Sequence, residues 1–417
     1  MNSVDRAIAL IPSTTRPPLL VGHVLDFPAG SFTLDEVRAR VAERAARLET
    51  LRIAAVRGGR SWVLTGPPEV GLHVREMRVD GRLGEELGER TDAVLRSPLP
   101  GGAAPGRAAP GDPLSRDPAP GWDLHLLTCP AEGVQRVCFR IDHALADGIG
   151  TAHLAAALLA DGPVRGPHAY RPVPRGRTSS AWLRNLPLRR LPPEETVPQG
   201  FGAAPDGLET LAYADVPDSS LRTPASRRGV SVNDVFLTAV TGALTAWQRQ
   251  HGDGVRDLAV MMPMSVREKG AELAPGNASV SVVVRLPCTL ATPDDQLCSL
   301  IGQSTLHKES GMRDSGWRAL LKAPPGLLLR SVLRPELRLA TSHININDAY
   351  SVLGAPLVAA SVLALNGPGL LGYFSLTRTT ETARIALLHD RAHPEAAELP
   401  GACVRAVEEL AELTEGP

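Results

Sequence analysis

The chain has 417 residues, of which 43% are apolar and 21% are charged, so it carries enough apolar surface to bury a core and is not disordered throughout. Its 44 basic and 45 acidic side chains nearly cancel, which argues against nucleic-acid binding, because nucleic-acid-binding proteins usually carry a basic excess. The five cysteines are scattered without the spacing of zinc ligands, and this usage favours a reducing, cytoplasmic compartment.

The first half of the chain predicts alternating strands and helices. Apolar and β-branched residues predict a strand over Leu19–Phe27, and Thr33 with Glu36 has the spacing of a capping box that opens a helix over Thr33–Leu48. The proline-rich and glycine-rich stretch from 97 to 121 predicts a surface loop. The other expected elements are strands at 61–64, 72–79, 122–128 and 134–142, and helices at 85–95 and from 150 onward.

A proline-rich segment over 162–205 carries seven arginines before its first acidic residue. We interpret it as a solvated crossover between two domains, with contact to a phosphate-bearing cosubstrate or an acidic membrane face as the alternative. Beyond it, Ser231 or Asn233 is expected to cap a long helix over 232–249. The remaining predicted elements are strands at 207–216, 258–264, 278–286, 339–346, 370–378 and 383–389, and helices at 293–306 and 396–413.

These elements predict an α+β fold with two halves of similar length, each holding a sheet with flanking helices. The expected domains are 1–161 and 206–417, joined by the crossover at 162–205. The longest nearly uncharged apolar run, 352–365, is too short to cross a bilayer. We therefore expect a soluble protein with at most peripheral membrane contact.

The most informative segment for chemistry is Asp142-His143-Ala144-Leu145-Ala146-Asp147-Gly148, between a predicted strand and a predicted helix. A histidine at the end of a strand can act as a general base, a glycine lets substrate approach the backbone, and a helix N-terminus can stabilise an oxyanion. Spacing alone leaves a purely structural histidine open. A metal site is not expected, because no third ligand has suitable spacing, and no GxSxG motif predicts a serine hydrolase.

The segment DHALADG resembles the HHxxxDG signature of condensation domains and chloramphenicol-acetyltransferase-like acyltransferases. More narrowly, the chain resembles the bacterial wax ester synthase/diacylglycerol acyltransferase (WS/DGAT) family. Further segments agree with that family in chain order, and several motifs in order are more specific than any one of them. These segments are Pro113–Trp122 (PLW region), Ser231–Leu244 (ND motif), Val260–Arg267 (VPVSLR strand end) and Gly276–Pro287 (Gly-Asn strand).

The resemblance implies two acetyltransferase-like lobes that form a pseudo-dimer, with a substrate tunnel between them. It implies that His143 deprotonates an acceptor that attacks an acyl thioester, and that Gly148 lies beside the reacting carbonyl. Asp147 would have a structural role and would pair with an arginine, for which Arg267 is the candidate. In the ND motif, Asn233 and Asp234 are expected to cap and anchor their helix rather than to react.

The chain departs from the family pattern in three places. Asp142 replaces the first histidine of the signature, Gly121 replaces the leucine of PLW, and Ser342–Asn347 replaces a Ser-Asn-Val-Pro-Gly-Pro-like strand. Strand alternation places Asp142 on the face away from His143 and places three polar side chains of the last segment on one face. These residues, His343, Asn345 and Asn347, and with them Trp122, are candidates for acceptor binding. Solvent-facing or backbone-bonding roles for the three, and a core position for Trp122, are the alternatives.

The resemblance and the residues together predict an acyltransferase that moves an acyl group from a coenzyme A or carrier-protein thioester to a hydroxyl or amine. No metal or prosthetic group and no covalent acyl-enzyme is expected, and a monomer would suffice. The departures favour an acceptor that is a small polar metabolite, as in tailoring of a natural product. Storage-lipid synthesis from a fatty alcohol or diacylglycerol is the alternative, and a non-catalytic homologue or a fold used for another reaction also stays open.

Overall fold

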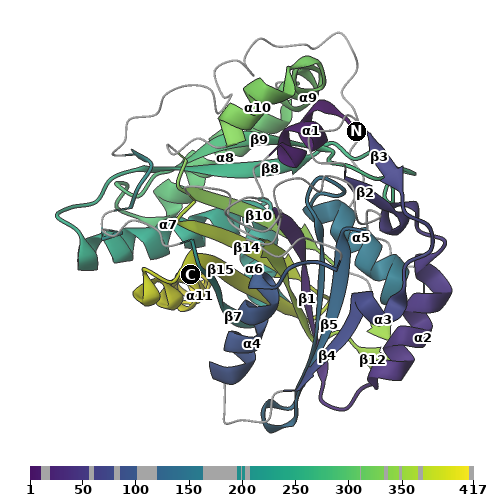
Figure 1. The fold of residues 1–417 in the computed structure, drawn as a ribbon. Coiled ribbons are helices and arrows are strands. Elements are labelled where there is room, and N and C mark those ends of the chain that lie inside the picture. The colour runs from purple at the N-terminus through teal and green to yellow at the C-terminus, as the bar shows by residue number, and fades with distance from the viewer. Residues whose placement is uncertain are drawn as a thin grey trace.

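The protein folds into two mixed lobes, each built on a sheet with helices packed against it (Figure 1). This architecture, seen here in a computed structural model, is the two-lobed α+β fold that the sequence predicts. The structure describes residues 1–10, 19–55, 61–78, 85–100, 120–162, 195–198, 200–201, 207–309, 311–332, 337–346, 350–364 and 370–412.

The N-terminal lobe holds a five-stranded sheet in the order β13-β1-β6-β5-β4. Apolar side chains of α2 and α5 pack on one face of this sheet, and those of α4 pack on the other. Its strands are β1 (Leu20–Pro28), β4 (Val74–Arg78), β5 (Trp122–Cys129), β6 (Val134–Asp142) and β13 (Ala359–Ala364). Its helices are α2 (Leu34–Ala45), α3 (Val70–His73), α4 (Glu85–Arg96) and α5 (Gly148–Leu159), beside the short strands β2 (Ile53–Ala55) and β3 (Trp62–Leu64).

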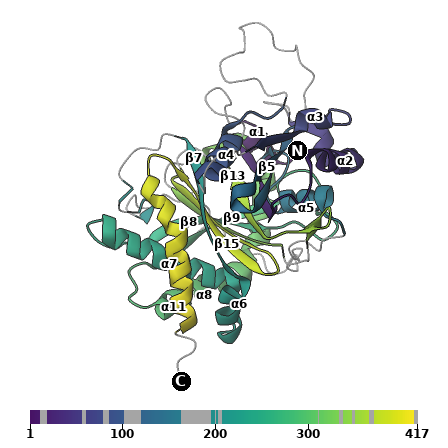
Figure 2. The same ribbon diagram turned by 90° about the horizontal axis from the view of Figure 1, so that it is seen from below.

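The C-terminal lobe holds a six-stranded sheet in the order β7-β15-β14-β10-β8-β9. Helices α7 and α11 pack together along this lobe (Figure 2) and supply much of its core. Its strands are β7 (Glu209–Pro217), β8 (Leu258–Ser265), β9 (Ser279–Leu286), β10 (Leu339–Asn345), β14 (Gly372–Arg378) and β15 (Thr382–Asp390). Its helices are α6 (Asp218–Arg227), α7 (Val232–His251), α8 (Pro293–Glu309) and α11 (Leu399–Glu412).

Three more helices gather at the top of the molecule in Figure 1: α1 (Ser3–Ala9), α9 (Met312–Lys322) and α10 (Pro325–Val332). Helix α1 comes from the start of the chain but packs against α9 and α10. A two-stranded ribbon of β11 (Ser351–Val352) and β12 (Ala355–Pro356) precedes β13. Helices α1, α6, α9 and α10 are not predicted from the sequence.

Local signals fix where several elements begin. Thr33 caps α2, and the side chain of Glu36 completes the predicted capping box. Ser231, not Asn233, caps α7, and Asp234 completes the reciprocal box there. Helix α5 begins at Gly148, earlier than predicted, because the Asp147 side chain caps it by accepting a hydrogen bond from the Gly150 N–H.

The two lobes are joined by a shared strand and by buried charges. Strand β13 comes from the second half of the chain but pairs antiparallel with β1, in the sheet of the N-terminal lobe. The Asp26 carboxylate on β1 accepts hydrogen bonds from Arg136 of its own lobe and from Arg384 on β15 of the other lobe. The predicted domain limits therefore stay a prediction, with β13 placed across them, and most of the 162–205 segment lies outside the described residues.

Candidate active site

The His143 segment is a short turn between β6 and α5, and its main chain is held from both lobes. The His143 N–H donates to the Leu19 carbonyl at 2.8 Å, and the Asn277 side-chain amide donates to the His143 carbonyl at 2.8 Å. The imidazole is half-buried, and its Nδ1 is a buried atom with no hydrogen-bond partner among the described residues. The turn therefore places a fixed histidine at the contact between the lobes.

Asp147 links the start of α5 to the C-terminal lobe. One carboxylate oxygen accepts from the Gly150 N–H at 2.7 Å. The other accepts from Arg267 Nη2 at 3.0 Å and from the Ala278 N–H at 2.7 Å. The aspartate and the arginine are both buried, so the ion pair that the resemblance implies is present and is shielded from solvent.

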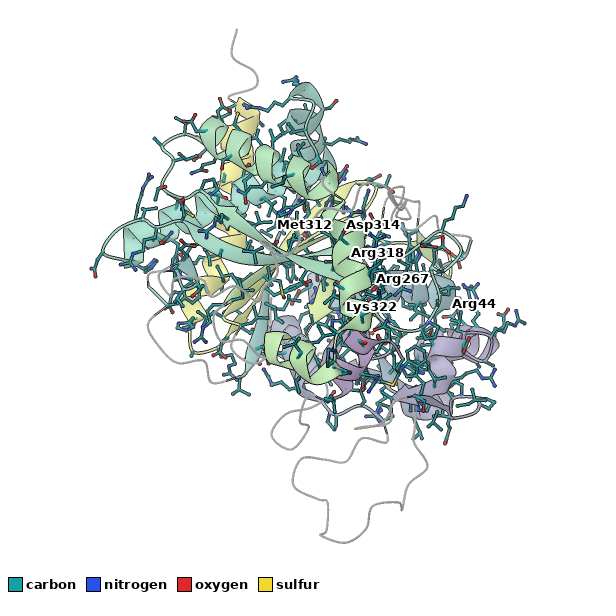
Figure 3. All side chains as sticks on the ribbon, turned by 90° about the horizontal axis from the view of Figure 1, so that it is seen from above. Arg44, Arg267, Met312, Asp314, Arg318 and Lys322 are labelled. Atoms are coloured by element: carbon teal, nitrogen blue, oxygen red, sulfur yellow. The ribbon has the colours of Figure 1, made fainter. Side chains whose placement is uncertain are left out.

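Arg267 follows β8 and is itself fully engaged through its terminal nitrogens. Nη1 donates to the carbonyls of Ala271 and Ala274, and Nη2 donates to the Gly276 carbonyl as well as to Asp147. Seen from above, Arg267 lies between the strands of the C-terminal lobe and the N-terminal lobe, whereas Arg44 lies at the outer edge of the latter (Figure 3). The guanidinium therefore fixes the geometry of the turn and is not free to bind substrate.

Gly148 is held by a buried histidine that the sequence analysis did not single out. His23 Nε2 on β1 lies 3.0 Å from the Gly148 carbonyl oxygen and 3.1 Å from Thr151 Oγ1. Because a carbonyl can only accept, Nε2 carries the proton in this contact. Burial lowers the pKa of His23 to about 4, so the ring is neutral at physiological pH. A methyl group at Gly148 would lie 3.4 Å from the Ile344 side chain, so β10 also reaches this point.

Strands β8 and β10 diverge toward the His143 turn. They pair only at Leu339 with Val260 and at Ala340 with Met261. Beyond that point His343 and Asn345 alternate with Ile344 along β10, and therefore lie on the face opposite to Gly148. His343 Nε2 and Asn345 Oδ1 are buried atoms without hydrogen-bond partners among the described residues.

The pKa of His343 lies at about 4, chiefly because of burial and secondly because of the nearby Arg378 charge. His343 and Asn345 share one face, as alternation predicts, but the contact with Gly148 belongs to Ile344. Asn347 lies outside the described residues. Acceptor binding by the first two therefore stays a prediction.

The remaining candidates have structural roles in the described part of the chain. Asp234 serves in the cap of α7, and Asn233 on the same turn lies with its amide 3.7 Å from the Met262 sulfur. Of the two roles that the sequence leaves open for Trp122, the structure supports the core position and not acceptor binding. Its indole is 0% exposed, stacks on the His73 ring at a centroid distance of 4.4 Å, and donates to the Leu51 carbonyl. It fills the core of the N-terminal lobe and cannot reach a ligand.

Sequence reasoning also missed Asp5, a fully buried carboxylate on α1 that contacts Asn277. A local signal was available, because Asn2 and Asp5 have capping-box spacing, and the structure contains that box.

In the part of the chain that is described, no three His, Cys, Asp or Glu side chains are grouped as a metal site requires. No single helix within the described ranges is long and apolar enough to cross a membrane.

Comparison with known proteins gives distant but nearly full-length similarity. No protein-family model matches the chain. A Mycobacterium tuberculosis H37Rv protein named as a diacylglycerol O-acyltransferase is 23% identical over 97% of this chain and 89% of its own length. A second from the same strain, Tgs4, with the same named activity, is 23% identical over 73% of each chain.

The solved structures share the fold at low sequence identity. The wax ester synthase/diacylglycerol acyltransferase from Marinobacter aquaeolei VT8 has a TM-score of 0.65 at 15% identity, with 99% of both chains covered. The first condensation domain of the calcium-dependent antibiotic synthetase has a TM-score of 0.63 at 18% identity, over 94% of this chain and 91% of that one. The starter condensation domain of rhizomide synthetase, in complex with C8-CoA and Leu-SNAC, has a TM-score of 0.62 at 14% identity, over 99% and 93%. The chain is therefore a distant, nearly full-length relative of proteins named diacylglycerol O-acyltransferases, and it shares the fold of a wax ester synthase/diacylglycerol acyltransferase and of condensation domains.

Proposed function

We propose that this protein is an acyltransferase that uses a thioester donor and His143 as its general base. The hydroxyl or amine of an acceptor attacks the thioester carbonyl carbon, and the imidazole takes the acceptor's proton as the new bond forms. The carbon–sulfur bond breaks, the thiolate leaves, and it receives that proton from the imidazolium. The products are an ester or amide and a free thiol, and the histidine is regenerated without an acyl-enzyme.

The observation that carries this proposal is the position of His143. The turn that holds it is tied to β1 on one side and to Asn277 of the other lobe on the other, so the ring sits where the lobes meet. Helix α5 begins five residues later, at Gly148, and the Gly148 and Ile149 N–H groups, which precede the Gly150 N–H whose hydrogen bond Asp147 accepts, are suited to a developing oxyanion. The named activity of the mycobacterial relatives supports the same reaction class.

For the donor, we favour coenzyme A or a carrier-protein thioester, since a starter condensation domain of the same fold was solved with C8-CoA. For the acceptor, we favour a small polar metabolite, because the segment Ser342–Asn347, in which β10 ends, carries polar side chains, although His343 and Asn345 lie on the face of β10 opposite to Gly148. Synthesis of storage lipid is the second candidate, supported by the relatives named diacylglycerol O-acyltransferases. No metal or prosthetic group enters the proposed reaction.

The proposal is tested by release of free thiol. The purified protein is incubated with acetyl-, octanoyl- and palmitoyl-CoA, each with hexadecanol, with a diacylglycerol, or with a panel of polar alcohols and amines. A thiol reagent gives the rate and mass spectrometry identifies the product. Acceptor-dependent thiol release with polar acceptors supports tailoring, and release with hexadecanol or diacylglycerol supports the storage-lipid alternative. Absence of transfer from every thioester contradicts the proposed activity.

Replacing the base should abolish most of the turnover. His143→Ala is expected to lower kcat by about 10²–10⁴-fold, the usual contribution of a positioned general base. His251→Gln is the matched control, because His251 is an exposed histidine at the end of α7, remote in the sequence from the motif. A folded His143→Ala variant that releases thiol at the wild-type rate shows that His143 is not the base.

A further inference from the structure

The N-terminal helix contacts the His143 turn through one asparagine. The Asn277 side-chain amide donates at 2.8 Å to the His143 carbonyl and at 2.9 Å to Asp5 Oδ1 on α1. The Asn277 main-chain N–H also donates to Asp5 Oδ1, at 2.7 Å. A single amide group thus connects the carboxylate of Asp5 to the main chain of His143.

Asp5 is also held in place by a hydrogen bond at the start of its own helix. Its Oδ2 accepts from the Asn2 N–H at 2.7 Å, which completes the capping box of α1. Asn2 in turn donates from its side-chain amide to the Asn277 carbonyl at 2.8 Å. Asn277 is therefore held through its N–H, its carbonyl and its side chain by Asp5 of α1 and by Asn2, which caps that helix.

The backbone of the C-terminal lobe is shaped to admit Asp5. Gly276 has φ +96°, a conformation that favours glycine, and a Cβ at this position would lie 2.8 Å from Asp5 Oδ2. Its N–H donates to the Leu145 carbonyl within the His143 turn at 2.6 Å. The close approach of α1 and the contact with the turn therefore occur at neighbouring residues, Gly276 and Asn277, just before β9.

We propose that Asp5 is a positioning residue for His143, acting through Asn277. By orienting the Asn277 amide, Asp5 fixes the His143 carbonyl and hence the direction in which the imidazole leaves the main chain. Capping of α1 alone requires only Oδ2, whereas Oδ1 is directed at Asn277. The role of this contact in turnover rests on the proposed acyl transfer, but the structural link between Asp5 and the turn does not.

The test compares Asp5→Ala, Asp5→Asn, Asn277→Ala and the double variant Asp5→Ala/Asn277→Ala with the wild type. Ser3→Ala is the control on the same helix, because the Ser3 hydroxyl donates to the Leu321 carbonyl of α9 and, among the described residues, to neither Asn277 nor the His143 turn. Each variant is measured for kcat and KM, and for amide hydrogen exchange of peptides that cover residues 143–150. Exchange reports the order of the turn whether or not the enzyme turns over.

We expect Asp5→Ala and Asn277→Ala each to lower kcat by about 10–100-fold with little change in KM, because misplacing a catalytic group by about 1 Å costs this much. Both should speed exchange in the 143–150 peptides severalfold. Asp5→Asn, which keeps an acceptor oxygen for Asn277, should restore part of the rate. The double variant should be no worse than Asn277→Ala alone, because the two residues act as one unit. Ser3→Ala should match the wild type.

An Asp5→Ala protein with wild-type exchange in the turn, or losses in kcat that add in the double variant, overturns the proposal. Where Asp5→Ala does not fold, Asp5→Asn and Asn277→Ala decide by the same criteria. If the wild type transfers no acyl group, the proposed function fails, and faster exchange in Asp5→Asn and Asn277→Ala than in Ser3→Ala still supports the link. Equal exchange in all three variants contradicts it.

Discussion

Asp142, which replaces the first histidine of the signature, shapes the turn that presents His143. Its Oδ1 accepts from the Ala144 N–H at 2.9 Å and its carbonyl accepts from the Leu145 N–H at 2.8 Å. The side chain is buried and lies on the face of β6 away from the following histidine, as alternation predicts. Aspartate closes turns of this kind readily, which explains why the turn forms without the histidine.

Gly121, which replaces the leucine of the PLW motif, packs against Asp142. A Cβ at Gly121 would lie 3.1 Å from Asp142 Cβ and 3.3 Å from the Leu145 side chain. We therefore expect Gly121→Leu to lower the free energy of unfolding by about 1–3 kcal/mol through overpacking, measured by urea denaturation. Gly88→Leu is the control, because open space surrounds that glycine on α4, and it should not destabilise. Equal stability of the two variants would show that the turn has room for the leucine.

Among the helices and strands, Asp147 connects the start of α5 to Arg267, which follows β8, and to Ala278, which precedes β9. Asp147→Ala removes a helix cap and leaves Arg267 buried without its carboxylate, so we expect a loss of about 3–5 kcal/mol in unfolding free energy. Asp147→Asn keeps an oxygen for the Gly150 N–H and should lose less. Thermal and urea unfolding of both variants measure this order. An alanine variant as stable as the wild type would show that the buried pair does not hold the lobes' contact.

Local patterns predicted elements well, and contacts between distant segments poorly. The strand at β6 and the capping box of α2 follow from residues a few positions apart. The pairing of β13 with β1 joins residues more than 300 apart, and no periodicity within either strand indicates its partner. The apolar run at 352–365 contains β13, but its sequence shows only that it is too short to cross a membrane and not which strand it pairs with.

The candidate site divides in the same way. His143, Asp147 and Arg267 were found because they lie in short motifs, and the structure brings them together. For Trp122 the sequence left acceptor binding and a core position open, because a tryptophan in a motif can serve either role, and only the folded chain shows that it fills the core. Asp5 and His23 were missed because each acts on the turn from more than 100 residues away, through contacts that only the folded chain creates.

In the whole molecule, buried ion pairs connect the sheet of the N-terminal lobe to the sheet of the C-terminal lobe. Arg384 donates two hydrogen bonds to Asp215 and one to Asp26, which Arg136 also contacts through two nitrogens. Although burial alone would raise it, the two arginines hold the pKa of Asp26 at about 2. Because the folded-state pKa lies below the usual 3.8, this stabilisation is present above about pH 4 and is lost as the pH falls toward 2.

The buried His23 and the half-buried His343 should make stability depend on pH in a milder range. The pKa values of His23 and His343 are lowered from 6.5 to about 4, so the folded state binds these protons less tightly than the unfolded chain does. Above pH 6.5 the two rings are neutral in both states and do not change the free energy of unfolding with pH. As the pH falls from 6.5 to about 4, the free energy of unfolding falls by about 1.4 kcal/mol per pH unit for each ring that stays neutral in the folded state. Urea unfolding from pH 7.5 to 4.5 measures this slope.

His343→Asn should reduce the slope by the share of one histidine. A free energy of unfolding that stays constant across this range would show that the two rings take up protons as readily in the folded state as in the unfolded chain.

Strand β13 has a consequence for how the chain is made. The edge of β1 acquires its partner only when residues 359–364 have left the ribosome, long after the rest of the N-terminal lobe has been translated. Until then the growing polypeptide carries an open sheet edge that could pair with a neighbouring nascent chain. A gene fragment that stops before residue 359 lacks the partner of β1, so we expect the N-terminal lobe made alone to keep that edge open.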